Sequence, residues 1–149
     1  HGVTQSMYDE VLLPTDGSSG TVDALSHALS IAADKDARVH VLYVVESRLY
    51  RAADDEMKGE VRRSLEEEGD RALEDARIRI EDEGLECVTE RREGIPQREI
   101  TGYADEAGID LVVMGTHGKT GPERMASLGS TTERVVKNAD QPVLVVDIG

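Results

Sequence analysis

The residue types that could do chemistry gather in one stretch near the C-terminal end, where glycines, hydroxyl residues and a lysine follow an apolar run. The pattern predicts a buried strand at 109–114, a glycine-punctuated loop at 115–128, a short helix at 129–137 and a second buried strand at 143–146. Glycines after a strand let backbone N–H groups approach an anion, and the N-terminus of the next helix adds partial positive charge. We therefore expect a phosphate-binding site that needs no catalytic side chain.

Two well-known phosphate-binding loops do not fit this stretch. The run Gly118-Lys119-Thr120 has the ending of a P-loop, but Val113 stands where that motif needs its first glycine. No G-x-G-x-x-G motif follows any of the expected strands. Both the Walker loop and the dinucleotide fingerprint are therefore excluded.

The spacing of Gly115, Gly118, Gly129 and Ser130 instead resembles the G-x2-G-x9-G-[ST] motif in the ATP-binding branch of the universal stress protein family. The resemblance runs from 7 to about 148 and includes the opening VLLPTDGS, the internal LYVVE and the closing PVLVV. This chain departs from the motif in one respect, because ten residues rather than nine separate Gly118 from Gly129.

The resemblance implies a bound adenine nucleotide, ATP with Mg²⁺, at the ends of several strands. The family aspartate that matches Asp16 accepts hydrogen bonds from ribose hydroxyls, and the positions that match Val44 and Met114 contact adenine through their backbone. The residues expected to contact the ligand are Thr15, Asp16, Val44, Met114, Gly115, Gly118, Lys119, Gly129, Ser130 and Thr131.

Two of these residues have structural roles that compete with ligand binding. Asp16 is placed to bond the Ser18 N–H in an Asx-type turn. Ser130 and Glu133 have the spacing of a capping box, in which each side chain bonds the other residue's N–H, and this role is compatible with phosphate binding. Because Glu133 would repel a triphosphate, we expect Mg²⁺ to accompany the nucleotide. We assign no protein ligand to the metal ion.

The rest of the chain alternates strands and helices. Strands are expected at 8–14, 39–45 and 85–92, and helices after Ser18 and Ser19, at 57–83 and from Pro96, with 50–56 as a loop. Alternation of this kind predicts an α/β fold, a doubly wound three-layer sandwich with a five-stranded parallel sheet and four helices. The polar and apolar alternation at 85–92 indicates a half-exposed strand at a sheet edge.

The order of the strands in the sheet is implied by the family resemblance and is 3-2-1-4-5. In such a Rossmann-like sheet, ligands bind at the carboxyl ends of the strands where the chain reverses direction, here between strands 1 and 4. Those ends are Thr15-Asp16 and Met114-Gly115. The motif and the topology therefore point to the same crevice.

The length indicates one domain, at 7–149, and the resemblance implies that it is of the nucleotide-binding universal stress protein type. The segment 1–6 precedes a methionine without any pattern, and we expect it to be a cloning remnant or disordered. No apolar run is long enough for a membrane span and no signal peptide pattern follows Met7, so we expect a cytoplasmic protein. The single cysteine, Cys87, is expected to be a buried apolar residue.

The charge argues against two classes of partner. A net charge of −14 disfavours binding to nucleic acid and to anionic membranes. The acidic composition, with neither Phe nor Trp, resembles that of proteins from halophilic organisms. Molar salt shortens the Debye length to about 3 Å and screens repulsion between carboxylates, so we expect the fold to weaken when salt is removed.

Several functions are compatible with this sequence. The first is a nucleotide-binding regulatory protein of the stress response, which the resemblance implies is a homodimer, paired through the last strand from Pro142 to Ile148. The second is a slow ATPase or an enzyme of phosphoryl or nucleotidyl transfer, for which Asp16, His117 and Glu133 are the candidate bases; we assign no catalytic residue. Binding of AMP or flavin, or of no nucleotide, is the third.

Overall fold

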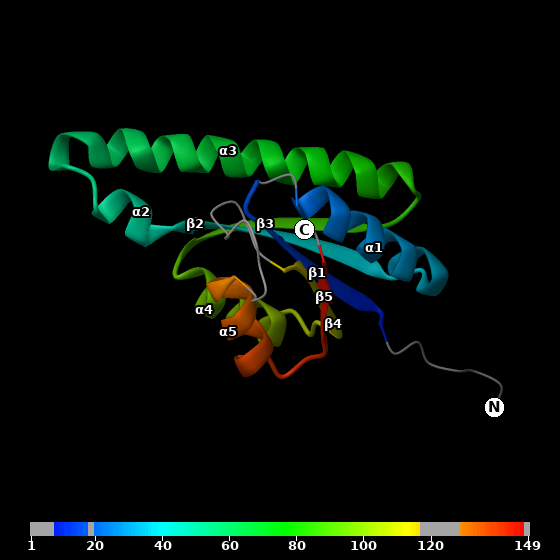
Figure 1. Ribbon diagram of the computed structural model, residues 1–149. Coiled ribbons are helices and arrows are strands. Elements are labelled where there is room, and N and C mark those ends of the chain that lie inside the picture. Colours follow the sequence, from blue (N-terminus) through cyan, green and yellow to red (C-terminus); the bar gives the residue numbers. More distant parts are fainter. Residues whose placement is uncertain (1–7, 18–19, 117–128, 148–149) are drawn as a thin grey trace, which may run out of the picture.

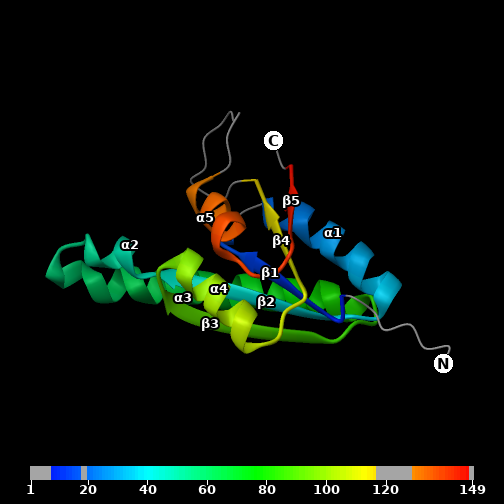
Figure 2. The same cartoon turned by 90° about the horizontal axis from the view of Figure 1, so that it is seen from below.

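The computed structural model describes residues 8–17, 20–116 and 129–147. Five parallel strands form one sheet in the order β3-β2-β1-β4-β5, which confirms the predicted order 3-2-1-4-5. Figure 2 shows this succession across the sheet. The strands are β1 (Glu10–Thr15), β2 (Arg38–Glu46), β3 (Cys87–Gly94), β4 (Leu111–Gly115) and β5 (Val143–Val146).

Helices cover both faces of the sheet, as the alternation of elements predicts. Helices α1 and α3 lie on one face, and α4 and α5 on the other (Figure 1). Since consecutive side chains of a strand point to opposite faces, each central strand contributes to both cores. The helices are α1 (Gly20–Lys35), α2 (Ser47–Arg51), α3 (Asp55–Asp82), α4 (Pro96–Glu106) and α5 (Ser130–Asn138).

The number of helices is one correction to the sequence analysis, because the described residues contain five helices rather than four. The additional helix is α2, whose five residues run into the start of the loop expected at 50–56. A single helical turn is too short to display a 3.6-residue apolar period, so the pattern could not reveal it. Helix α3 also begins at Asp55, two residues before the expected position.

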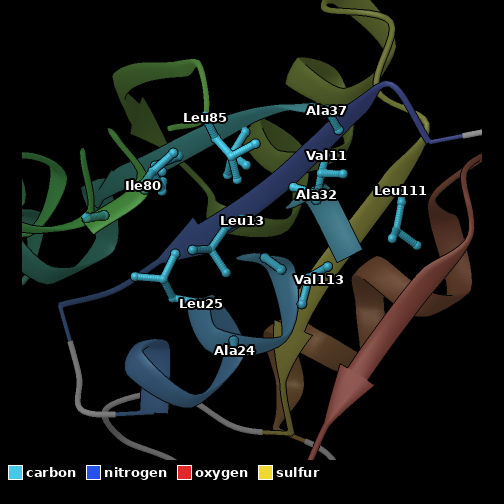
Figure 3. Close-up of a cluster of buried hydrophobic side chains, with 14 of the residues drawn as sticks. Val11, Leu13, Ala24, Leu25, Ala32, Ala37, Ile80, Leu85, Leu111 and Val113 are labelled. Atoms are coloured by element: carbon cyan, nitrogen blue, oxygen red, sulfur yellow. The ribbon is translucent and has the colours of Figure 1, made fainter. Parts of the chain in front are cut away.

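The two cores divide along the faces of the sheet. The core under α1 and α3 includes Val11 and Leu13 of β1 and Val113 of β4 (Figure 3). The core under α4 and α5 includes Leu12 of β1 and Leu42 of β2. Burial on both faces explains why these strands are almost continuously apolar.

The long helix α3 is buried only over part of its length. We expected Met57, Val61, Leu65, Leu73, Ala76 and Ile80 to form its buried stripe. The last three are buried, and Val61 and Leu65 are half-buried. Met57 is 46% exposed, contrary to expectation. The reason is visible in Figure 1, where the first turns of α3 extend past the end of the sheet with α2. An apolar stripe predicts burial only where another element faces it.

Strand β3 lies at one edge of the sheet and β5 at the other. The edge position expected for the half-exposed strand at 85–92 is thus confirmed. Charged side chains of β3 reach α3, since Arg91 pairs with Asp70 at 2.7 Å and Glu93 with Arg62 at 2.8 Å. These ion pairs link α3 to the edge strand. Each contributes little to stability, because its side chains are exposed.

Candidate functional site

The end of β1 forms a tight turn into α1 through a threonine hydroxyl. The Thr15 Oγ1 accepts a hydrogen bond from the Gly17 N–H at 3.1 Å and lies 3.0 Å from the Thr21 Oγ1. Gly17 has φ of +82°, a conformation that favours glycine. Thr15 therefore makes a turn bond of the kind that we expect for Asp16, but one residue earlier in the chain. Ser18, the turn partner expected for Asp16, lies outside the described residues. Asp16 itself is half-exposed just beyond the strand.

The end of β4 is joined to the start of α5 by two hydrogen bonds. The Thr132 hydroxyl donates to the Gly115 carbonyl at 2.9 Å, and the Gly129 N–H donates to the Thr116 carbonyl at 2.7 Å. Thr132 is only 4% exposed, so its hydroxyl is held in a fixed position. The N-terminus of α5 is thereby fixed beside the carboxyl end of β4.

The expected capping box at the start of α5 is wrong. Gly129, in extended conformation, occupies the N-cap position and has no side chain that could cap the helix. Ser130 is the first helical residue, and the Glu133 N–H donates to the Gly129 carbonyl at 2.9 Å as in an ordinary helical turn. A helix whose cap lacks a side chain leaves its first N–H groups to other acceptors.

The residues expected to bind a ligand meet at this point in the sheet. β1 and β4 are neighbours, and the helices that follow them cover opposite faces, which is the arrangement of a topological switch point. Figure 1 shows α1 above the sheet and α5 below it. The carboxyl ends of β1 and β4 place Thr15, Asp16 and Gly115 at the same edge of the sheet, and the two bonds at the end of β4 hold Gly129, Ser130 and Thr131 beside Gly115.

The two residues expected beside adenine lie on one face of the sheet. Val44 of β2 is half-buried and packs on the core under α4 and α5, and Met114 of β4, 6% exposed, belongs to the same core. They flank β1 from either side, because β2 and β4 are its two neighbours. Gly118 and Lys119 lie outside the described residues.

A group of residues that the sequence analysis missed surrounds the β1 turn. The Tyr43 hydroxyl of β2 donates to the Glu68 carboxylate of α3 at 3.4 Å. The same carboxylate lies against Gly17, where an added Cβ would be 2.8 Å from Glu68 Oε2. Burial, reinforced by the negative charges of Glu68 and Asp16, raises the pKa of Tyr43 to about 12.

The sequence contained one indication of this group. Gly69 stands in the middle of a long helix, where glycine is unfavourable, and such a glycine often marks a close approach. An added Cβ at Gly69 would lie 2.5 Å from the ring of Tyr43. Nothing in the acidic run at 66–68 distinguished Glu68 from its neighbours, because the direction of a helical side chain depends on what the helix packs against.

Glu133 and Cys87 are weak candidates for chemistry. Glu133 is exposed and lies 3.9 Å from Lys137 on its own helix, while His117 lies outside the described residues. Burial raises the pKa of Cys87, which is half-buried rather than fully buried, to about 11, so its reactive thiolate is disfavoured. Within the described residues, no group of three or more His, Cys, Asp and Glu side chains is placed to hold a metal ion. In that same part of the chain, every helix is too short or too polar to span a lipid bilayer.

The fold and the site define a class of protein, a doubly wound α/β domain with a candidate anion site at its switch point. Comparison with known proteins narrows this class. Residues 7–147 match the Universal stress protein family. The universal stress protein MJ0531 of Methanocaldococcus jannaschii is 43% identical over 143 residues, which cover 95% of this chain and 84% of that protein. The chain therefore belongs to the universal stress protein family.

Solved structures agree with this assignment. The structure of MJ0577, a universal stress protein of the same organism, superposes with a TM-score of 0.85 at 35% identity and covers 97% of this chain and 99% of that one. Two more distant structures contain nucleotides. One is a universal stress protein in complex with cAMP (24% identity, TM-score 0.71, 97% and 100% of the chains), and the other is the Arabidopsis thaliana protein At3g01520 with AMP bound (20% identity, TM-score 0.70, 94% and 92%). At these identities the likeness concerns the fold alone.

Proposed function

We propose that this protein binds an adenine nucleotide, ATP with Mg²⁺, at the carboxyl ends of β1 and β4, and acts as a regulatory protein of the stress response. The observation that carries the proposal is the fixed N-terminus of α5. Thr132 and Gly129 bond it to the end of β4, next to the end of β1. A helix N-terminus presents N–H groups and partial positive charge to an anion.

The first helical residues of α5 would receive the phosphates. Ser130, Thr131 and Thr132 are the first three residues of the helix, and their N–H groups have no acceptor within it. Gly129, without a side chain, allows a phosphate to approach this end closely. The Lys119 side chain would add a positive charge from the loop.

The remaining contacts would come from the other strands. Asp16 would accept hydrogen bonds from the ribose hydroxyls, and the backbones of Val44 and Met114 would contact the adenine. Mg²⁺ would arrive with the nucleotide, because the negative charge of a triphosphate beside Glu133 needs a counter-ion. A magnesium ion of this kind is held mainly by phosphate oxygens and water, with one or two carboxylates at most.

The proposal is supported by the related folds that hold cAMP and AMP. These two nucleotides are also the alternatives to ATP as the ligand of this protein. We would denature the purified protein and identify any released nucleotide by mass spectrometry, then measure thermal stabilisation by ATP with Mg²⁺, AMP and cAMP. Preference for AMP or cAMP would replace ATP in the proposal, and a yellow released compound would indicate a flavin. Sustained phosphate release over many turnovers would favour an ATPase.

A variant pair tests the position of the site. Gly118→Val should abolish stabilisation by ATP if the backbone of this loop approaches the phosphates. Gly59→Ala is the matched control, because Gly59 is exposed on α3 and an added Cβ would meet nothing within 4 Å. Equal stabilisation of both variants by ATP would remove the loop from the site.

We also propose a homodimer formed through the last strand, over Pro142 to Ile148, of which the structure describes the residues up to 147. β5 is an edge strand, and three of its four residues are only half-buried. The carbonyls of Pro142 and Val146 accept hydrogen bonds from β4, so the N–H of Val145 points away from β4 and toward a potential partner strand. Val145→Pro should therefore produce monomers in sedimentation analysis, whereas Val145→Thr, which keeps the N–H, should remain dimeric.

A further inference from the structure

The two strands that flank the candidate site are paired for only part of their length. Over the described residues of both strands, β1 pairs with β4 at Val11 with Leu111 and at Leu12 with Val112. On its other side, β1 pairs with β2 along its whole length from Glu10 to Thr15. Figure 3 shows the ribbons of β1 and β4 close together at their amino ends and separating toward their carboxyl ends.

The direction of the backbone groups explains where this pairing stops. In a parallel strand, alternate residues direct their N–H and C=O groups to opposite neighbours. The Asp9 carbonyl accepts from Arg38 at the start of β2, and the Glu10 carbonyl accepts from Asp110 just before β4, each at 2.8 Å. The even-numbered residues of β1 therefore face β4, and Pro14 is one of them.

The bond that is missing between the two strands can be identified by its donor and its acceptor. The N–H groups of Val112 and Thr116 donate to the carbonyls of Pro142 and Val146, on the β5 side, so the odd-numbered residues of β4 face β1. The next bond of the ladder would therefore join an N–H at position 14 to the carbonyl of Val113. Proline has no N–H, and the ladder ends one step before it.

We propose that Pro14 is a positioning residue for the nucleotide: by removing the single N–H that would extend the β1–β4 ladder, it keeps the carboxyl ends of the two strands apart. The space between Thr15 and Gly115 then remains available to the ligand. This inference rests on the proposed function, because it assigns the space to a nucleotide.

Two observations separate this role from simple termination of the strand. Pro14 does not end β1, since it pairs with Leu42 and Thr15 pairs with Tyr43 on the β2 side. Proline is also unfavourable in a central strand and is normally found at sheet edges. At this position the proline leaves the pairing with β2 intact and interrupts only the pairing with β4. A ligand site between the ends of β1 and β4 requires this interruption.

The test restores the missing N–H. Pro14→Ala should form the additional bond to Val113, so that the amide of residue 14 becomes protected from hydrogen exchange in NMR measurements without nucleotide. Binding of ATP with Mg²⁺, measured by calorimetry, should weaken about tenfold, which corresponds to about 1.4 kcal/mol. Pro96→Ala is the control and should bind as the unchanged protein does, because Pro96 stands at the first turn of α4, where no N–H is needed.

A second substitution separates the N–H from the rigidity of the proline ring. Lactic acid introduced at position 14 by suppressor-tRNA translation has the side chain of alanine but an ester oxygen in place of the N–H, and it should restore the original affinity. Equal affinity of the alanine and lactic acid variants, or an amide at position 14 that exchanges like an exposed one, would overturn the inference. If the unchanged protein binds none of ATP, AMP and cAMP, the proposed function fails, and the role assigned to Pro14 at a nucleotide site fails with it. Amide exchange in Pro14→Ala still shows in that case whether Pro14 holds the two strands apart.

Discussion

Replacing Gly69 by alanine tests the contact between α3 and β2 beside the candidate site. In most exposed helices this change is stabilising by about 0.5–1 kcal/mol, because alanine loses less backbone entropy than glycine. Here the new Cβ would lie 2.5, 2.7 and 2.9 Å from three atoms of the Tyr43 ring. Those atoms belong to a rigid ring that is 3% exposed, so relief requires the ring or the helix to move.

The expected magnitude follows from these opposing effects. Overpacking of a core costs about 1–3 kcal/mol. Because all three contacts are shorter than 3.0 Å, we expect the upper part of this range, about 2–3 kcal/mol. Against a helix gain of about 1 kcal/mol, Gly69→Ala should lower the free energy of unfolding by about 1–2 kcal/mol. For a domain of this size the melting temperature should fall by about 5 °C. Because Tyr43 is the register partner of Thr15, we also expect weaker nucleotide binding.

The assay is urea denaturation followed by circular dichroism, with Gly59→Ala on the same helix as control. An added Cβ at Gly59 meets nothing within 4 Å, so this variant should be stabilised by the full helix gain of about 0.5–1 kcal/mol. Tyr43→Val removes the ring that the new Cβ would contact. In this background, Gly69→Ala should therefore lower the free energy of unfolding much less than it does in the unchanged protein. Equal stabilisation by both glycine substitutions would refute the contact.

Three further predictions concern the site and the surface. Thr132→Val removes the hydroxyl that bonds the Gly115 carbonyl. It should lower the free energy of unfolding by about 1 kcal/mol in urea denaturation and weaken nucleotide binding in calorimetry. Unchanged affinity would show that this bond does not contribute to the nucleotide site. The pKa of Tyr43 is raised to about 12 in the folded protein, so its contribution is fully present below pH 10 and is lost as the pH rises from 10 to 12. Over that range the unchanged protein should lose about 2–3 kcal/mol more unfolding free energy than Tyr43→Phe, and parallel pH profiles would contradict this. With a net charge of −14, the protein should melt at a lower temperature in dilute buffer than in molar KCl, because salt screens the carboxylates; a melting temperature that does not depend on KCl would remove the proposed salt adaptation.

The elements that were predicted accurately carry strong local patterns. The apolar run at 143–146 is β5 with the same bounds, and Pro96 is the first residue of α4 as expected. The predictions that were wrong depended on distant neighbours. Met57 continues the apolar stripe of α3 but has no sheet beside it. Ser130 has the spacing of a cap, but Gly129 takes the cap position and Thr132 makes the bond that fixes the helix.

The sequence by itself determined the alternation of strands and helices, the family and the glycines beyond the fourth strand, since each follows from the types of residues close together in the chain. Only the tertiary structure decided that Glu68 lies over the β1 turn and that the N–H missing at Pro14 is one that would have faced β4. These outcomes depend on register and on helix rotation against the sheet. Both are fixed by packing between segments that can be a hundred residues apart, where no local pattern records them.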